Sequence, residues 1–247
     1  MDDSTIALQS ALTLPDVAAL RIRKLTKEFG SRRILDGVDL DIPANLAVSL
    51  IGANGSGKST LLRCIVRLVE PTSGEVHLFG EDVRALGGRT LQRLRSQVGF
   101  VFQKHNLVPG LSALSNVLHG VQARSSGPRT WVQSVARADA RDEALACLAA
   151  VGLESQALQR VDSLSGGQSQ RVAIARMLMQ RPQILLADEP DASLDPRTGR
   201  EIMELLYQLT RSRGIPVVIA SHGACPVLLG PDRWPCRRPD RARHASA

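Results

Sequence analysis

The stretch GANGSGKST, from Gly52 to Thr60, decides the fold of this chain. It follows AVSLI (47–51), a run typical of a strand buried on both faces, and it leads into STLLRCIVRLV (59–69), whose apolar residues recur at helical spacing. A glycine-rich loop between a strand and a helix fits GxxxxGK(S/T), in which backbone N–H groups surround phosphate oxygens. A glycine-rich turn without a ligand is the alternative, but this context favours phosphate binding.

Side chains of the loop add to what its backbone offers. Lys58 can reach the β- and γ-phosphates of a nucleotide, and the Ser59 hydroxyl can hold Mg²⁺. The glycines let the backbone curl closely around the phosphates. The residues predicted to bind ATP here are Gly52, Ala53, Asn54, Gly55, Ser56, Gly57, Lys58, Ser59 and Thr60.

A second motif supplies carboxylates. ILLADEP (184–190) runs along a predicted buried strand to Asp188, which is suited to hold Mg²⁺, and then to Glu189, which is suited to polarise an attacking water. On its own, Asp-Glu at the end of a strand would be interpreted as a solvated turn. Together with the phosphate loop, the pair predicts a site that hydrolyses ATP.

The rest of the pattern predicts an α/β fold with two kinds of sheet. Alternating apolar residues predict half-buried antiparallel strands at 20–25, 38–42 and 75–79. Continuous apolar runs predict strands of a parallel sheet at 47–51, 184–187 and 217–220. Between 104 and 164 the strand signal is absent and DARDEALACLAAVG (139–152) predicts a helix ending at Gly152, so this interval is predicted to be a helical insertion.

LSGGQSQR (164–171) has no carboxylate, imidazole or thiol for catalysis. Its S-x-x-Q fits a capping box, and two glycines leave backbone N–H groups bare at the positive end of a helix. A capped helix with no further role is the alternative. With the other motifs, the stretch resembles the signature sequence of the ATPase subunits of ABC transporters, usually LSGGQQQR, and the resemblance covers about residues 20–222.

This resemblance implies a P-loop NTPase (RecA-like) core with an antiparallel β subdomain and an inserted helical subdomain. It also implies a head-to-tail homodimer, in which the signature residues of one copy close over the γ-phosphate bound to Lys58 of the other. The signature residues assigned to nucleotide binding are Ser165, Gly166, Gly167 and Gln168.

Other family positions carry over one at a time. Phe29 resembles the aromatic that stacks on adenine, with a core position as the alternative. Gln103, placed at the end of a strand GFVFQ (99–103), resembles the glutamine that senses Mg²⁺ and water. Asp195 resembles the aspartate that crosses the dimer, with an Asp-Pro turn as the alternative. His222 resembles the histidine that contacts the γ-phosphate.

Together these motifs give the predicted roles in the site. The predicted catalytic residues are Glu189, His222, Gln103 and Lys58, and the predicted metal ligands are Ser59, Gln103 and Asp188.

The sequences of several stretches resemble those of the phosphonate-import branch of the family. The most notable is KHNLVPGLSALSNVLHG (104–120), where the family's ATPases contact membrane subunits. The resemblance implies two permease subunits, an extracytoplasmic solute-binding protein and a place on the cytoplasmic face of the inner membrane. Importers for phosphate, amino acids or methionine share much of this sequence. Soluble ATPases that act on ribosomes or DNA are a further alternative, but they commonly carry two ATPase units or a long coiled-coil insertion.

Composition agrees with this interpretation. The 247 residues carry a net charge of +7, but only 3% of them are aromatic and no basic run is interleaved with stacking residues, so no nucleic-acid partner is expected. No apolar run approaches the roughly 18 residues of a membrane-spanning helix. The N-terminus, MDDSTIALQS, lacks the pattern of an export signal. Four cysteines without paired spacing predict no disulfide framework, and Cys64 and Cys147 are expected to be core residues.

The two ends depart from the family pattern. Residues 1–19 are predicted to be an extension, and the Pro- and Arg-rich segment 223–247 contains four prolines where a helix would be expected. We hypothesise an altered reading frame just past His222. A nucleotide-binding remnant that no longer drives transport is therefore an alternative function.

Overall fold

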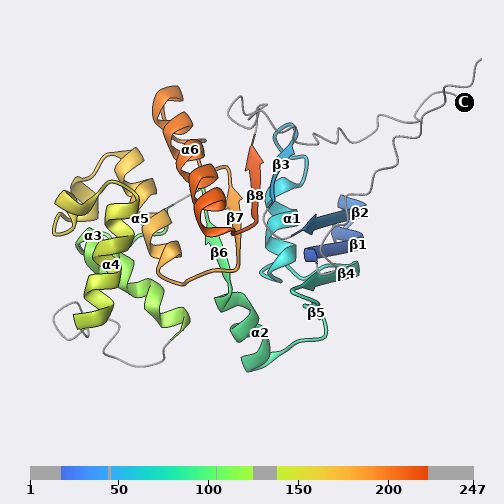
Figure 1. The fold of residues 1–247 in the computed structure, drawn as a ribbon. Coiled ribbons are helices and arrows are strands. Elements are labelled where there is room, and N and C mark those ends of the chain that lie inside the picture. Colours follow the sequence, from blue (N-terminus) through green and yellow to red (C-terminus); the bar gives the residue numbers. More distant parts are fainter. Residues whose placement is uncertain (1–17, 44–45, 104, 125–137, 222–247) are drawn as a thin grey trace, which may run out of the picture.

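The computed structural model describes residues 18–43, 46–103, 105–124 and 138–221. They form one antiparallel and one parallel sheet of four strands each, with a cluster of helices beside the parallel sheet (Figure 1). Three parts of the prediction lie outside the described residues: residues 1–17 of the predicted extension 1–19, His222, and the segment 223–247.

The antiparallel sheet has the order β2-β1-β4-β5, with strands β1 (Ala18–Phe29), β2 (Arg32–Pro43), β4 (Ser73–Leu78) and β5 (Glu81–Asp82). The three predicted antiparallel strands are confirmed, and β1 and β2 are longer than predicted because they form a long hairpin. Alternating residues of β1, such as Leu20 and Ile22, are fully buried. Their burial is what the two-residue period predicts.

The parallel sheet has the order β3-β8-β7-β6, with strands β3 (Ala47–Ile51), β8 (Val217–Ser221), β7 (Ile184–Asp188) and β6 (Val98–Val101). Ile184 and Leu186 of β7 belong to a core shared with the antiparallel sheet and the first helix, whereas Leu185 and Ala187 belong to a core shared with the later helices. Both faces of β7 are thus covered, which explains its unbroken apolar run.

Two helices pack against the first of these cores: α1 (Lys58–Ile65) and α2 (Gly88–Ser96). The prediction that the first helix continues to Val69 is wrong, because α1 is followed by Arg67 in the left-handed conformation with φ of 54°. Beyond the end of the helix, the Arg67 guanidinium donates to the carbonyl oxygens of Val83 and Arg84. Cys64 in α1 and Cys147 are both buried, as expected.

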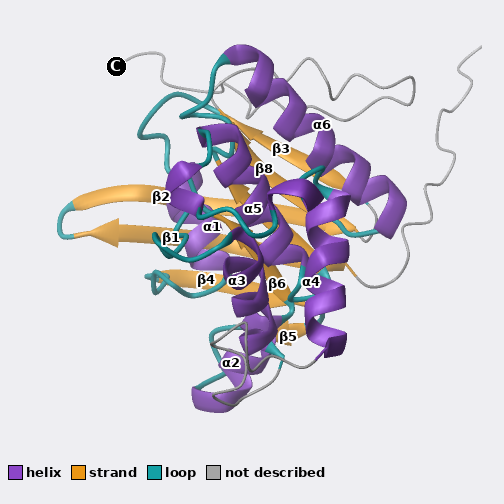
Figure 2. Cartoon of the chain, turned by 90° about the vertical axis from the view of Figure 1, so that its left-hand side faces the viewer, coloured by secondary structure: helices purple, strands orange, loops and turns teal. Residues whose placement is uncertain are grey.

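The helical insertion is confirmed within the described residues between 105 and 164, where the only strand-like pairing is an isolated bridge between Ser112 and Arg160. Its elements are α3 (Ala113–Leu118), η1 (His119–Ala123), α4 (Ala138–Ala150), η3 (Glu154–Gln156) and η4 (Val161–Ser163). The predicted helix at 139–152 is α4, and Gly152 follows it with φ of +72°. Two further helices, α5 (Gly166–Leu178) and α6 (Pro196–Arg213), lie on the same side of the parallel sheet as the insertion, and α5 also contacts α3 and α4 (Figure 2). In the part of the chain that the structure describes, every helix is too short or too polar to span a bilayer.

Candidate functional site

The glycine-rich loop lies between β3 and α1 and is tightly curled. Gly55 and Gly57 have φ of +77° and +93°, a conformation that L side chains rarely adopt. A Cβ at Gly52 would lie 2.7 Å from Ser56 Oγ, and one at Gly57 would lie 3.0 Å from the carbonyl oxygen of Ile34. The loop therefore requires glycine both for its dihedral angles and for its close packing.

Lys58, the first residue of α1, folds back over this loop. Its Nζ donates to the carbonyl oxygens of Gly52 at 2.7 Å and Ala53 at 3.1 Å, and lies 3.7 Å from Glu189 Oε1. The side chain is only 7% exposed. The ammonium group is thus held in a fixed, largely water-free position at the centre of the site.

Asp188 meets the same loop from the end of β7. The Ser59 hydroxyl donates to Asp188 Oδ1 at 2.6 Å, and Arg63 Nη2 lies 3.5 Å from Oδ2. Asp188 is only 2% exposed, and a buried carboxylate needs partners. The Ser59 hydroxyl supplies a hydrogen bond and the Arg63 guanidinium supplies an opposite charge. Arg63 was not predicted; its position one helical turn after Ser59 was the available signal.

Glu189 adopts a left-handed conformation with φ of 49°. Its backbone N–H donates to the carbonyl oxygen of Ala220 in β8 at 3.0 Å, so the neighbouring strand fixes the position of the turn. Non-glycine residues with positive φ are uncommon and cluster at functional sites.

The glycine-rich loop, the start of α1, Glu189 and the ends of β1 and β2 line a cavity of about 260 Å³. Phe29 at the end of β1 lines it and is 52% exposed, so the alternative of a core position is wrong. Lys27 Nζ lies 4.5 Å from the centre of the Phe29 ring. The lining residues are Phe29, Arg32, Ile34, Gly55, Ser56, Gly57, Lys58, Ser59, Thr60 and Glu189. Arg32 and Ile34 were missed because nothing in the sequence says that β2 approaches the loop.

The signature residues lie outside this cavity. Ser165 caps α5: its Oγ accepts from Gln168 N at 3.2 Å, and Gln168 Oε1 accepts from Ser165 N at 2.9 Å. The predicted capping box is therefore confirmed. Ser165 and Gly166 are exposed, whereas Gly167 is buried.

Asp195 is also placed away from the cavity, at the start of α6. Its Oδ1 accepts from the backbone N–H groups of Arg197 and Thr198, both at 3.1 Å. The hydrogen bond from the Thr198 side chain, followed by these backbone bonds, lowers the pKa of Asp195. The exposed carboxylate is thus an N-cap that stays ionised.

Gln103 is exposed and follows β6, whose carboxyl end lies at the same edge of the sheet as that of β7. The prediction that the strand extends to Gln103 is wrong, because β6 ends at Val101. Asn54 is exposed within the loop. His222, which follows β8, lies outside the described residues.

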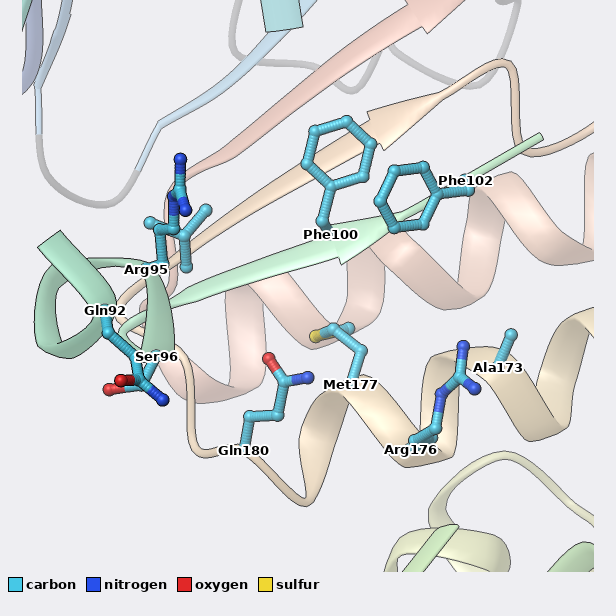
Figure 3. Close-up of a pocket in the computed structure, with 10 residues that line it drawn as sticks. Gln92, Arg95, Ser96, Phe100, Phe102, Ala173, Arg176, Met177 and Gln180 are labelled. Carbon is cyan, nitrogen blue, oxygen red and sulfur yellow. The ribbon is translucent and has the colours of Figure 1, made fainter. Parts of the chain in front are cut away.

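A second cavity, of about 330 Å³, lies between α2, β6 and α5 (Figure 3). The stacked rings of Phe100 and Phe102, 4.2 Å between centres, line it, and Arg95 and Arg176 give it a basic character without an acidic residue. Arg176 donates to the carbonyl oxygens of His105 and Asn106, just beyond Gln103. Burial lowers the pKa of Arg176.

Comparisons with known proteins agree with this geometry. The ABC transporter family matches residues 35–192. The phosphonates import ATP-binding protein PhnC of Bordetella parapertussis is 48% identical over 209 residues, covering 83% of this chain and 81% of that protein. The phosphate-import ATP-binding protein PhnC of Mycolicibacterium smegmatis is 49% identical over 200 residues, covering 81% and 76%.

Solved structures give the same result. The ATP-binding cassette MJ0796, a dimer in a post-hydrolysis state with bound ADP and Pi, is 38% identical with a TM-score of 0.71, covering 83% of this chain and 88% of that one. The cbiO1 protein of Clostridium perfringens, part of an ABC transporter complex, is 28% identical with a TM-score of 0.73, covering 84% and 80%. The chain therefore belongs to the ABC transporter family and is one of its ATP-binding subunits.

Proposed function

We propose that this chain is the ATP-hydrolysing subunit of a membrane importer that takes up phosphonates. The observation that carries the proposal is the cavity lined by Lys58, Ser59 and Glu189, found in a chain that matches phosphonate-import ATPases over about four-fifths of its length. Hydrolysis at this cavity supplies the energy for transport by the permease.

Each lining group has a role that its position supports. The backbone N–H groups of the loop and the Lys58 ammonium bind the phosphates, and Phe29, exposed at the mouth of the cavity, stacks on adenine. Glu189 holds and polarises the attacking water, and receives its proton as the oxygen attacks the γ-phosphorus and the bond from that phosphorus to the bridging oxygen breaks, releasing ADP. Gln103 and His222 are proposed to complete the water's surroundings.

Mg²⁺ fits the donors at Ser59 and Asp188. The hydroxyl and the carboxylate are 2.6 Å apart in a half-buried position, and neutral and anionic oxygens are the ligands that this ion prefers. Ser59, Asp188 and Gln103 are proposed as the residues that hold it. When bound, Mg²⁺ supplies positive charge that stabilises the phosphates during transfer.

The site is proposed to be completed by a second copy of the chain. Ser165, Gly166 and Gly167 do not line the cavity of their own chain, yet they present a positive helix end that could face an anion. The dimeric state of MJ0796 with ADP and Pi supports a dimer. The arrangement that we propose for it is head to tail, so that these residues and Asp195 face the partner's nucleotide.

We propose that the permease docks at the second cavity and at the adjoining residues 104–120. Aromatic rings surrounded by basic and amide side chains suit an amphipathic segment with an acidic residue, and Arg176 links this surface to the loop after Gln103. Two permease subunits, a solute-binding protein outside the membrane and a peripheral location on the cytoplasmic face of the inner membrane complete the assembly.

Phosphate is the second candidate solute, because the relative from Mycolicibacterium smegmatis is named a phosphate importer. ATPase activity and uptake in the reconstituted complex, measured with alkylphosphonates, phosphate and amino acids, separate the candidates. Uptake of phosphonates in preference to phosphate supports the proposal. Preference for phosphate or an amino acid contradicts the solute, and absence of ATP hydrolysis favours the remnant.

A further inference from the structure

We infer that Thr198 of α6 positions the signature end of α5, residues Ser165–Gln168, and that the methyl group of Thr198 is what requires glycine at position 167. The functional part of this inference rests on the proposed head-to-tail dimer. The packing part rests on the contacts within one chain.

The two signature glycines have different surroundings. A Cβ at Gly167 would collide with Thr198 Cγ2, and the next nearest atom would be Thr198 Cβ, at 3.7 Å. A Cβ at Gly166 would meet only Leu194 Cδ2, at 3.4 Å. Neither glycine has positive φ, so neither is required by its backbone conformation. Since alanine is the better helix former, the need for glycine at 167 comes from a single methyl group.

The start of α6 fixes the backbone that carries this methyl group. Thr198 N donates to Asp195 Oδ1 at 3.1 Å, and the Thr198 side chain is close enough to the same carboxylate to lower the pKa of Asp195. With the hydroxyl directed to the cap, Cγ2 is directed to α5. Rotating the side chain away from a larger residue at position 167 would move the hydroxyl away from Asp195, whereas the backbone bonds of the cap would remain.

A second contact joins α5 and α6 along the same line, and we call this line of contact between the two helices the seam. Arg171, one turn beyond Gly167, donates to Glu201 at 3.0 Å and to the carbonyl oxygen of Val151 at 3.1 Å. Residues four apart on α5 thus meet residues three apart on α6, so one face of each helix forms the seam. It joins the signature end to the helix that Asp195 caps, and both are proposed to face the partner's nucleotide.

A larger residue at position 167 would change the position of the signature end of α5. Extra volume at residue 167 moves the start of α5 away from α6, because packed interiors yield by displacement rather than by compression. Ser165 and the bare N–H groups would then no longer lie where the partner's γ-phosphate is held. Thr198 acts through Gly167 and is a positioning residue without contact to the nucleotide.

The test is a rescue experiment on the full-length chain. G167A, T198S and G167A/T198S are compared by melting temperature and by ATP-dependent dimerisation, with every variant also made in an E189Q background to slow hydrolysis. T198S removes only Cγ2 and keeps the hydroxyl for the cap. We expect G167A to melt at a lower temperature and to need at least about tenfold more ATP for dimerisation, and G167A/T198S to return to within about threefold of T198S alone.

Three results would overturn the inference: G167A indistinguishable from wild type, no rescue in either measurement, or rescue of the melting temperature without rescue of dimerisation. The last would mean that position 167 needs glycine for a direct phosphate contact. If E189Q alone does not dimerise with ATP, the proposed dimer fails instead, and the melting temperatures still decide the packing part.

Discussion

The Ser59 hydroxyl donates a 2.6 Å hydrogen bond to Asp188 across 129 positions of sequence. The bond joins the first turn of α1 to the end of β7, which places two of the three proposed metal ligands side by side. Because Asp188 is 2% exposed, removing this partner leaves a buried carboxylate whose remaining charged partner among the described residues is Arg63.

We therefore expect S59A to lower Mg²⁺ affinity by about 10–100-fold, as loss of a ligand or of its orienting group does at other sites. Mg²⁺ titration of ATPase activity and of ATP-analogue binding measures the change. S59T is the control, since the motif accepts either hydroxyl and the variant keeps the oxygen. Equal Mg²⁺ dependence of S59A and S59T would contradict the assignment.

E189Q should slow ATP hydrolysis by about 10²–10⁴-fold, because the amide cannot accept the proton of the attacking water. Since the amide is similar in size to the carboxylate, ATP binding should persist and an ATP-bound dimer should accumulate. Size-exclusion chromatography with and without ATP detects it. E189Q/K58A serves as the control that cannot hold the phosphates. A monomer at saturating ATP would favour the nucleotide-binding remnant.

F29A should raise the KM for ATP by roughly 2–10-fold, which corresponds to the ~0.5–1.5 kcal/mol of an aromatic contact, with little change in kcat. The melting temperature should stay near that of wild type, because the ring is 52% exposed. F29W keeps a stacking surface and should retain the wild-type KM. If F29A and F29W bind ATP alike, Phe29 does not stack on adenine.

The stability of the helical insertion should depend on pH through Glu143. This carboxylate accepts from Arg181 at 2.7 Å and from Arg124 at 3.0 Å. Burial alone raises the pKa of Glu143, but the hydrogen bonds from the two arginines outweigh it and lower the pKa below its usual value. The stabilisation is present above the unfolded-state pKa and is lost as the pH falls through the lower, folded-state pKa.

E143Q should accordingly reduce the free energy of unfolding at pH 7 by about 1 kcal/mol, a small amount because Arg181 is largely exposed. The difference from wild type should shrink towards zero as the pH falls below the folded-state pKa of Glu143, as long as both proteins still fold there. Urea denaturation at several pH values measures it. D139N, which removes an acid from the first turn of the same helix, is the matched control. A pH-independent difference would show that Glu143 acts through packing.

Cys64 should be inert in the folded protein. Burial raises the pKa of its thiol to about 11, so little thiolate exists at pH 8. Iodoacetamide labelling at pH 8, read by peptide mass spectrometry, should modify Cys64 at least about tenfold more slowly in the native than in the urea-denatured chain. Rapid native labelling would mean that α1 opens readily from the sheet.

Local sequence patterns were enough for the elements and for the residue types of the site. The phosphate loop, the carboxylates after β7, the capping box at Ser165 and most strands could be predicted, because each depends on neighbours along the chain. Helix ends were less predictable: the apolar stripe of α1 continues past Ile65, but the chain leaves the helix at Arg67 to reach carbonyls near β5.

Contacts between distant segments required the folded chain. Arg32, Ile34 and Arg63 enter the site only because two sheets meet over α1, and no periodicity in their own segments indicates this. The same holds for Gly167. Its sequence neighbours explain a helix cap with bare N–H groups, whereas its need to be glycine comes from Thr198, which is 31 positions further along and is brought near by the packing of α5 on α6.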